Sequence, residues 1–122
     1  LDTLEYLRKG GRISGATAVV GSMLNIKPLI GVQDGVVANV GKARGPKAAD
    51  KLLRELIAKS GGIDFSKPLC AAYSGNEDDN LKTFLADSTD TLCGTEAPIA
   101  TVGCVIGAHV GPGAVAMAYF KN

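Results

Sequence analysis

The feature that most constrains the fold of this chain is the dipeptide Asp34-Gly35, which stands between two apolar stretches. Asp-Gly readily adopts the positive-φ conformations of the two-residue turn that joins antiparallel strands. Residues 26–32 and 36–44 are therefore predicted to be the two strands of a β-hairpin. The hairpin in turn requires an antiparallel component in whatever sheet the chain forms.

Two helices are predicted before the hairpin. Three leucines within residues 1–9 recur at helical spacing, and the glycines at 10–11 end that first helix. Ser14 has the side chain of a helix N-cap, which predicts a second helix over residues 15–25. Because that helix is apolar on most of its faces, it either packs in the core or lines an apolar cavity.

Helices and strands alternate in the rest of the chain. Pro46 begins an amphipathic helix that ends at about residue 60. The segment 74–76 is predicted to cap a helix whose first turn is acidic, as the helix dipole favours. Together these patterns predict one domain over residues 1–122, with an α/β fold: a mixed, largely antiparallel sheet of about five strands with helices packed on it. The three remaining strands are predicted at 69–73, 98–102 and 114–120, with a short helical turn at 103–109.

The composition argues against several classes of function. The net charge is only +1, and aromatic residues make up 5% of the chain, so nucleic acid is not an expected partner. No apolar run reaches membrane-spanning length, and no membrane insertion is expected. Three cysteines and one histidine, with no Cys-x-x-Cys pair, predict neither a metal site nor a disulfide framework. This cysteine usage, without a leader segment, is typical of a cytoplasmic protein.

The residues best suited to chemistry lie in the segment 108–114, which holds the single histidine of the sequence, His109. Gly111 and Gly113 tolerate positive φ and close approach, and Pro112 restricts the backbone between them. We expect a loop that fixes the imidazole and leaves free amide N–H groups beside it. Such a loop can receive an oxygen anion. An ordinary turn is the alternative.

Catalytic groups are otherwise sparse. No serine has the context of a nucleophile elbow, and the segment 41–45 lacks the spacing of a phosphate-binding P-loop. We therefore predict a binding protein that is not an enzyme. Two alternatives stay open: an enzyme domain in which His109 acts on a small phosphorylated substrate, and a purely structural or dimerising domain.

Several sequence blocks resemble the DegV family. They occur in order, cover nearly the whole chain, and belong to the second of the two α/β domains of that family. The resemblance implies that the chain is the C-terminal, lipid-binding domain of a longer bacterial protein, which agrees with a first residue other than methionine. The blocks are LEYLRKGGRIS at 4–14, LNIKPLI at 24–30, Asp34-Gly35, KARG at 42–45 and IGAHVGPGA at 106–114.

By this resemblance, the chain binds a long-chain fatty acid together with an N-terminal domain. Family members hold the fatty acid between the two domains and present its carboxylate to a fatty-acid kinase. The kinase forms the acyl-phosphate that is used in phospholipid synthesis. The implied partners are thus the fatty acid, the kinase subunit and the N-terminal domain of the same protein, and no cofactor is implied.

The resemblance also assigns roles to single residues. His109, with Gly111 and Gly113 beside it, is expected to receive the carboxylate, and Arg12 is expected to contact the kinase. Two features depart from the family: the hydroxyl-rich segment of the first domain is not in this chain, and Cys104 stands where the family often has proline. The second predicted helix and the first strand are expected to form the pocket for the acyl tail, through Val19, Val20, Met23, Leu24, Ile26, Leu29 and Ile30.

Overall fold

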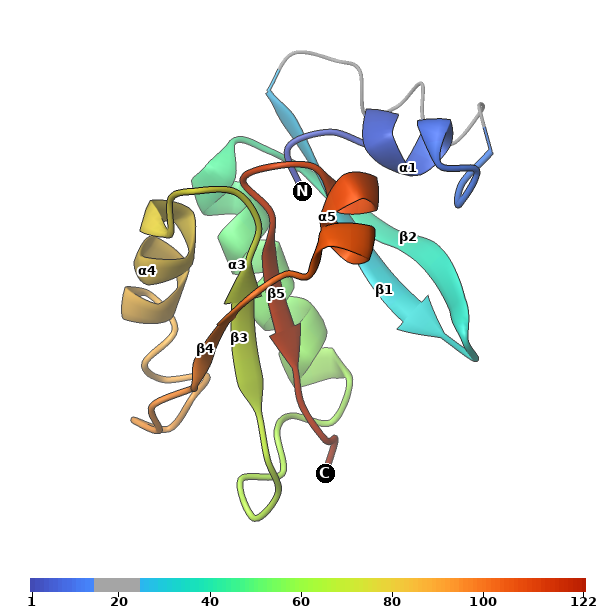
Figure 1. Cartoon of the computed structure of the whole chain (residues 1–122). Helices are drawn as coiled ribbons and strands as arrows, with labels where there is room; N and C mark the ends of the chain where they lie inside the picture. Colours follow the sequence, from blue (N-terminus) through green and yellow to red (C-terminus); the bar gives the residue numbers. More distant parts are fainter. Residues whose placement is uncertain (15–24) are drawn as a thin grey trace.

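The structure is a computed structural model that describes residues 1–14 and 25–122. Within these ranges the elements follow the order α1, β1, β2, α3, β3, α4, β4, α5, β5 (Figure 1). The helix predicted over residues 15–25 falls outside the described residues, except for its last position. The elements span α1 Glu5–Lys9, β1 Ile26–Gln33, β2 Val36–Arg44, α3 Pro46–Lys59, β3 Cys70–Tyr73, α4 Asp79–Ala86, β4 Ile99–Thr101, α5 Cys104–Val110 and β5 Val115–Ala118.

Strands β1 and β2 form the predicted antiparallel hairpin. Asp34 and Gly35 connect them with φ angles of 51° and 78°, the positive values that a two-residue turn of this kind requires. The register shifts between Leu29 and Ile30, which pair with Gly41 and Asn39, so Val40 is the extra residue of a β-bulge in the second strand. A bulge strengthens the local twist of a hairpin.

A second, three-stranded sheet has β3 at its centre, with β4 parallel to it on one side and β5 antiparallel on the other. The mixed α/β fold is thereby confirmed, but the five strands are divided between two sheets. The two sheets are not joined by strand pairing. Side chains of helix α3 pack against both of them instead. Leu52 lies against Gly41 of the hairpin, whereas Ile57 belongs to the core beneath the three-stranded sheet.

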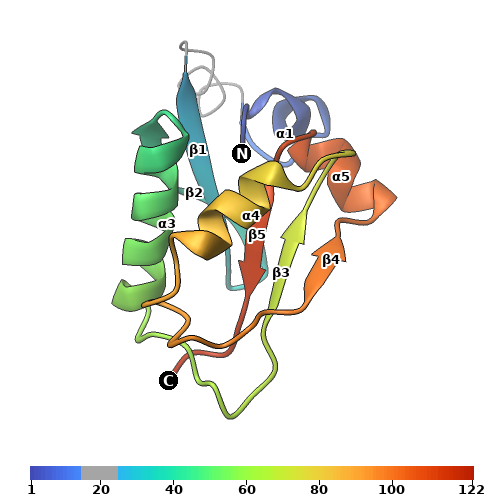
Figure 2. The ribbon, with the colours of Figure 1, turned by 90° about the vertical axis from the view of Figure 1, so that its left-hand side faces the viewer.

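The main core lies between the three-stranded sheet and helices α3 and α4, which both cover the same face (Figure 2). In β5, Val115 and Met117 point into this core, and the alternating residues Ala116 and Ala118 are exposed on the opposite face. That opposite face therefore carries small side chains. The buried members of the core are Ile57, Ile63, Ala71, Leu81, Phe84 and Leu92.

A smaller apolar cluster joins α1 to the hairpin. Leu4 and Leu7 are buried, and Ile30 and Val37 of the two hairpin strands pack against them. Helix α5 lies beside α1 in both views (Figures 1 and 2). The first helix thus connects the hairpin with the histidine-bearing helix. None of the helices in the described ranges combines the length and hydropathy of a membrane span.

Candidate functional site

His109 stands in the last turn of α5, and its imidazole is held in one orientation. The Nδ1 atom lies 2.7 Å from the carbonyl oxygen of Val105. Because a carbonyl oxygen can only accept a hydrogen bond, Nδ1 must carry the proton. Within residues 1–14 and 25–122 no polar group is bonded to the other ring nitrogen, Nε2. In this tautomer Nε2 of the half-buried imidazole is a hydrogen-bond acceptor that no described polar group occupies.

The imidazole lies directly on the backbone of Gly10, at the C-terminus of α1. A Cβ atom placed on Gly10 would be 2.6 Å from Nε2 of His109, and it would come closer still to Cδ2. Tyr6, one turn earlier, makes the corresponding contact with the glycine that ends α5: a Cβ on Gly111 would be 2.6 Å from its ring. One face of α1 thus supports both the histidine and the start of the glycine loop.

The amides of the glycine loop are occupied, so the expectation of free N–H donors at these positions is wrong. Gly111 donates its N–H to the carbonyl of Gly107 at 2.9 Å, which continues the helix. Gly113 donates to the carbonyl of Ser74, also at 2.9 Å. The two glycines instead supply positive φ angles of 75° and 77° that turn the chain from α5 into β5.

Ser74 holds this loop in place from the end of β3. Its side chain is buried; Oγ donates to the carbonyl oxygen of Gly111 and accepts from the N–H of Ala114 at 3.0 Å. The prediction that the segment 74–76 caps a helix is therefore wrong, since α4 has Asp78 as its N-cap residue. The local pattern indicates a helix N-terminus at Ser74, but its hydroxyl bonds instead to Gly111, 37 residues later in the sequence.

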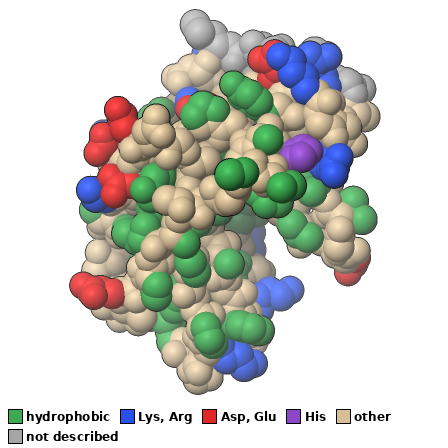
Figure 3. All heavy atoms as spheres, in the orientation of Figure 1, with side chains coloured by type: hydrophobic (Ala, Val, Ile, Leu, Met, Phe, Trp, Pro, Cys, Tyr) green, Lys and Arg blue, Asp and Glu red, His purple; other side chains and the backbone are tan. Residues whose placement is uncertain are grey.

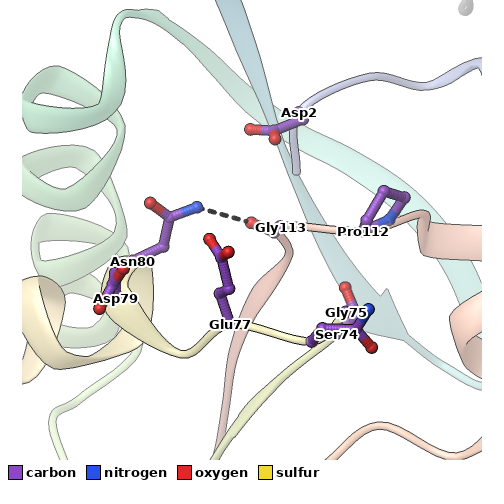
Figure 4. A pocket seen from close by; sticks show the side chains of 9 residues that line it. Asp2, Ser74, Gly75, Glu77, Asp79, Asn80, Pro112 and Gly113 are labelled. Atoms are coloured by element: carbon purple, nitrogen blue, oxygen red, sulfur yellow. Dashed lines mark hydrogen bonds between the residues drawn. The ribbon is translucent and has the colours of Figure 1, made fainter.

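An open polar pocket of 410 Å³ lies beside the loop, on the side of Gly113 (Figure 4). Asn80 donates from Nδ2 to the Gly113 carbonyl at 3.3 Å across it. Carboxylates on its wall disfavour an anionic ligand in this pocket. The residues that line this pocket are Asp2, Ser74, Gly75, Asn76, Glu77, Asp79, Asn80, Pro112 and Gly113. In the described ranges, no set of three or more His, Cys, Asp or Glu residues is arranged to hold a metal ion.

Arg12 is exposed, and its guanidinium Nη1 donates to the carbonyl of Gly10 at 2.8 Å. Arg12 therefore lies in the same turn as Gly10, the residue on whose backbone the imidazole packs. Among the expected tail-pocket residues, Leu29 is buried, Ile26 is half-buried, and Ile30 packs on the cluster beneath α1. The others fall outside the described residues: Val19, Val20, Met23 and Leu24.

Apolar side chains stand exposed next to the histidine. Val105 and Ile106 of α5 are 72% and 60% exposed, although both are large and hydrophobic. Figure 3 shows hydrophobic side chains beside the imidazole and over the nearby surface of the molecule. Exposed apolar area of this kind next to a polar anchor is typical of a binding surface.

These features define a small α/β domain in which two short helices and a serine-anchored glycine loop position one histidine. The sequence model of the DegV family, which is described as a family of uncharacterised proteins, matches residues 1–122. This chain belongs to the DegV family.

A DegV domain-containing protein of Clostridium acetobutylicum is 36% identical over 127 residues, covering 99% of this chain and 42% of the relative. A structure reported for the fatty acid binding of a DegV family protein from Thermus thermophilus is 33% identical. It has a TM-score of 0.68 and covers 94% of this chain and 41% of that one. The chain thus spans less than half the length of these relatives.

A third protein shares the fold. The Fatty Acid Kinase B3 protein of Streptococcus pneumoniae, in a structure loaded with linoleic acid, has a TM-score of 0.85 and covers 100% of this chain and 43% of that chain. The two sequences are 20% identical, so this likeness concerns the fold alone.

Proposed function

We propose that this chain is the C-terminal domain of a two-domain protein that binds a long-chain fatty acid, with His109 at the carboxyl group. The observation that carries the proposal is the imidazole fixed through Nδ1, with Nε2 unbonded to any polar group of the described residues. Membership of the DegV family supports the same conclusion, because the Thermus thermophilus relative is reported as a fatty acid binder.

The charges around the loop decide on which side the carboxylate binds. A buried carboxylate is unfavourable unless donors are paired with it. The pocket on the Gly113 side is lined by Glu77 and Asp79, and by Asp2 in an ion pair with Lys27, so its wall disfavours an anion. The histidine side offers Nε2 instead, which accepts from a carboxylic acid or, in the imidazolium form, donates to a carboxylate. In this proposal Gly111 and Gly113 contribute the shape of the loop rather than hydrogen-bond donors.

The acyl tail supplies most of the binding free energy in this proposal. Each CH₂ group removed from water contributes about 0.8 kcal/mol. Exposed Val105 and Ile106 and the small-residue face of the three-stranded sheet are apolar surfaces near the histidine that the tail and an N-terminal domain would cover. The strand residues Ile26, Leu29 and Ile30 remain proposed members of the tail wall.

We assign the transfer of the fatty acid to a kinase to the exposed turn after α1. Arg12 is exposed, and it reaches the backbone on which His109 rests. A guanidinium in this position can contact a partner that approaches the carboxyl group, and it can attract a phosphate. The proposed reaction partner is a cytoplasmic fatty-acid kinase that converts the bound acid to an acyl-phosphate for phospholipid synthesis.

Native mass spectrometry of the protein expressed from its complete reading frame tests the binding function. We expect a mass increment that matches a fatty acid, and solvent extraction should release that acid. His109→Ala should weaken binding by roughly tenfold to a hundredfold, since it removes a hydrogen bond to a charged group. A protein that stays free of lipid after fatty acid is added would overturn the proposal.

Arg12→Ala separates binding from transfer. The variant should bind fatty acid with the affinity of the unchanged protein and should slow acyl-phosphate formation when the kinase is present. Arg8→Ala is a matched control, because Arg8 is also exposed on α1 but donates no side-chain hydrogen bond to Gly10. A loss of fatty acid affinity in the Arg12 variant alone would contradict the assignment to the kinase.

A further inference from the structure

The two adjacent glycines after α1 serve different purposes. Gly11 has φ +70°, a left-handed conformation that side chains disfavour, and a Cβ placed on it would meet nothing within 4 Å. Gly10 has φ −79° and ψ −1°, an ordinary helical conformation open to any residue. The backbone therefore requires glycine at Gly11 and does not require it at Gly10.

What requires glycine at position 10 is the imidazole of His109. A Cβ on Gly10 would stand 2.6 Å from Nε2 and nearer still to Cδ2, well inside the closest approach that real Cβ atoms make. The neighbouring backbone would not relieve this overlap, because the Tyr6 carbonyl oxygen lies 3.3 Å away from the same Cβ position. The ring itself would have to move.

The ring cannot move freely, since its other edge is also held. Nδ1 is bonded to the Val105 carbonyl at 2.7 Å, so the imidazole is fixed between its own helix and the turn after α1. Hydrogen bonds also fix the turn after α1. The Gly10 N–H donates to the Tyr6 carbonyl at 2.9 Å, and the Gly10 carbonyl accepts from the Arg12 side chain. A side chain at position 10 would therefore force the imidazole out of its bonded position.

We propose that Gly10 is a positioning residue for ligand binding, which acts by giving His109 a flat backbone surface that sets where Nε2 points. This inference rests on the proposed function of His109. It makes α1 part of the binding site, although no side chain at position 10 exists to touch a ligand. The residue pair comes from the two ends of the chain, so neither end alone forms the site.

Fatty acid titration of the protein expressed from its complete reading frame tests the proposal through a double-mutant cycle. Gly10→Ala should weaken fatty acid binding by roughly tenfold or more, as the loss of the histidine bond would. In the His109→Ala background the ring is gone, and Gly10→Ala should have no further effect. Equal losses in both backgrounds would overturn the positioning role.

Gly11→Ala is the matched control. It strains a positive-φ turn and should lower the melting temperature, yet leave the fatty acid affinity unchanged. Gly10→Ala should lower the melting temperature less than Gly11→Ala does, because the preference for alanine over glycine in a helical conformation offsets part of the lost imidazole bond. The opposite ranking, with Gly10→Ala unfolding the protein and sparing binding, would contradict the inference.

A second readout needs no ligand, so it separates this inference from the proposed function. The ¹⁵N imidazole resonances of His109 report which ring nitrogen carries the proton and whether it is hydrogen-bonded. We expect them to shift in Gly10→Ala and to stay constant in Gly11→Ala. Constant resonances in Gly10→Ala would overturn the inference, whereas a shift in a protein that binds no fatty acid would overturn the proposed function only.

Discussion

The three-stranded sheet and the α1–α5 corner are built on different principles. Beneath the sheet, Ala71, Leu81 and Phe84 have no exposed surface and form a continuous apolar core. At the α1–α5 corner, the described residues form a much smaller apolar cluster around Leu4 and Leu7, and hydrogen bonds and side chains packed on glycines add to it. Burial of apolar surface beneath the sheet thus stabilises the fold, whereas the contacts of the α1–α5 corner orient the imidazole of His109. The comparison predicts that stability and ligand binding respond to different mutations.

The largest stability effect should come from the core. Phe84→Ala empties a fully buried site and should lower the free energy of unfolding by about 3–5 kcal/mol. Urea denaturation followed by circular dichroism measures the change. Under conditions in which the variant stays folded, its fatty acid affinity should match that of the unchanged protein. A loss of less than about 1 kcal/mol would show that the core relaxes around the cavity.

Ser74→Ala should affect both regions, because Ser74 lies where they meet. The change leaves the carbonyl of Gly111 and the N–H of Ala114 without their side-chain partner, in a buried place. We expect a loss of about 2–3 kcal/mol in the free energy of unfolding. Fatty acid affinity should fall as well, since the loop that ends the His109 helix loosens. If denaturation and ligand titration both match the unchanged protein, the serine does not anchor the loop.

The protonation of His109 predicts a pH effect on binding alone. Nδ1–H is bonded to the Val105 carbonyl, so Nε2 can meet a carboxylate only if the imidazole holds a second proton or the acid keeps its own. Because the complex then holds this proton, Kd should rise as the pH rises.

Fluorescence displacement titrations between pH 7.5 and 9 measure this slope. His109→Gln is the matched control, because an amide donates from the same region of the site without gaining a proton. Its Kd should be independent of pH over the same interval. An unchanged slope in His109→Gln would mean that the proton resides elsewhere in the complex.

The smallest effect is expected far from both regions. The Ser66 hydroxyl and backbone N–H both donate to Asp64, at 2.6 and 3.0 Å, and they hold the pKa of that carboxyl below its ordinary value. This stabilisation is present above the ordinary value and is lost as the pH falls through the lowered pKa. Ser66→Ala should raise the pKa, as a ¹³C carboxyl titration would show, and should leave fatty acid binding unchanged. A pKa that does not rise would mean that the backbone bond suffices.

The turns and helices that are determined by residues adjacent in sequence could be predicted from the sequence. The turn at Asp34-Gly35 is governed by two residues, and helix α3 begins at the expected proline and ends one residue before the expected position. The division into two sheets could not be predicted, because it depends on which surfaces of α3 each sheet occupies. The periodicity of apolar residues identifies the apolar face of a helix, but it does not show which sheet packs against that face.

The candidate site shows the same limit more sharply. His109 and its glycines could be found because a single histidine before Gly-Pro-Gly is a local pattern. The role of Ser74 could not be predicted, because the local pattern indicates a helix end and its bond to the loop after α5 spans 37 residues of sequence. The role of Gly10 could not be predicted either, because two consecutive glycines after a helical pattern indicate only a helix stop.

The anchoring of the loop by Ser74 also has a consequence for how the molecule reaches its native state. Its two bonds to the loop span 37 and 40 residues, and the imidazole rests on the opposite end of the chain. Closing loops of this length costs chain entropy, so we expect these contacts to form after the more local ones. The contacts of the α1–α5 corner are therefore expected to be completed late in folding. Until the sheet has paired, we expect the imidazole of the nascent chain to have no fixed direction.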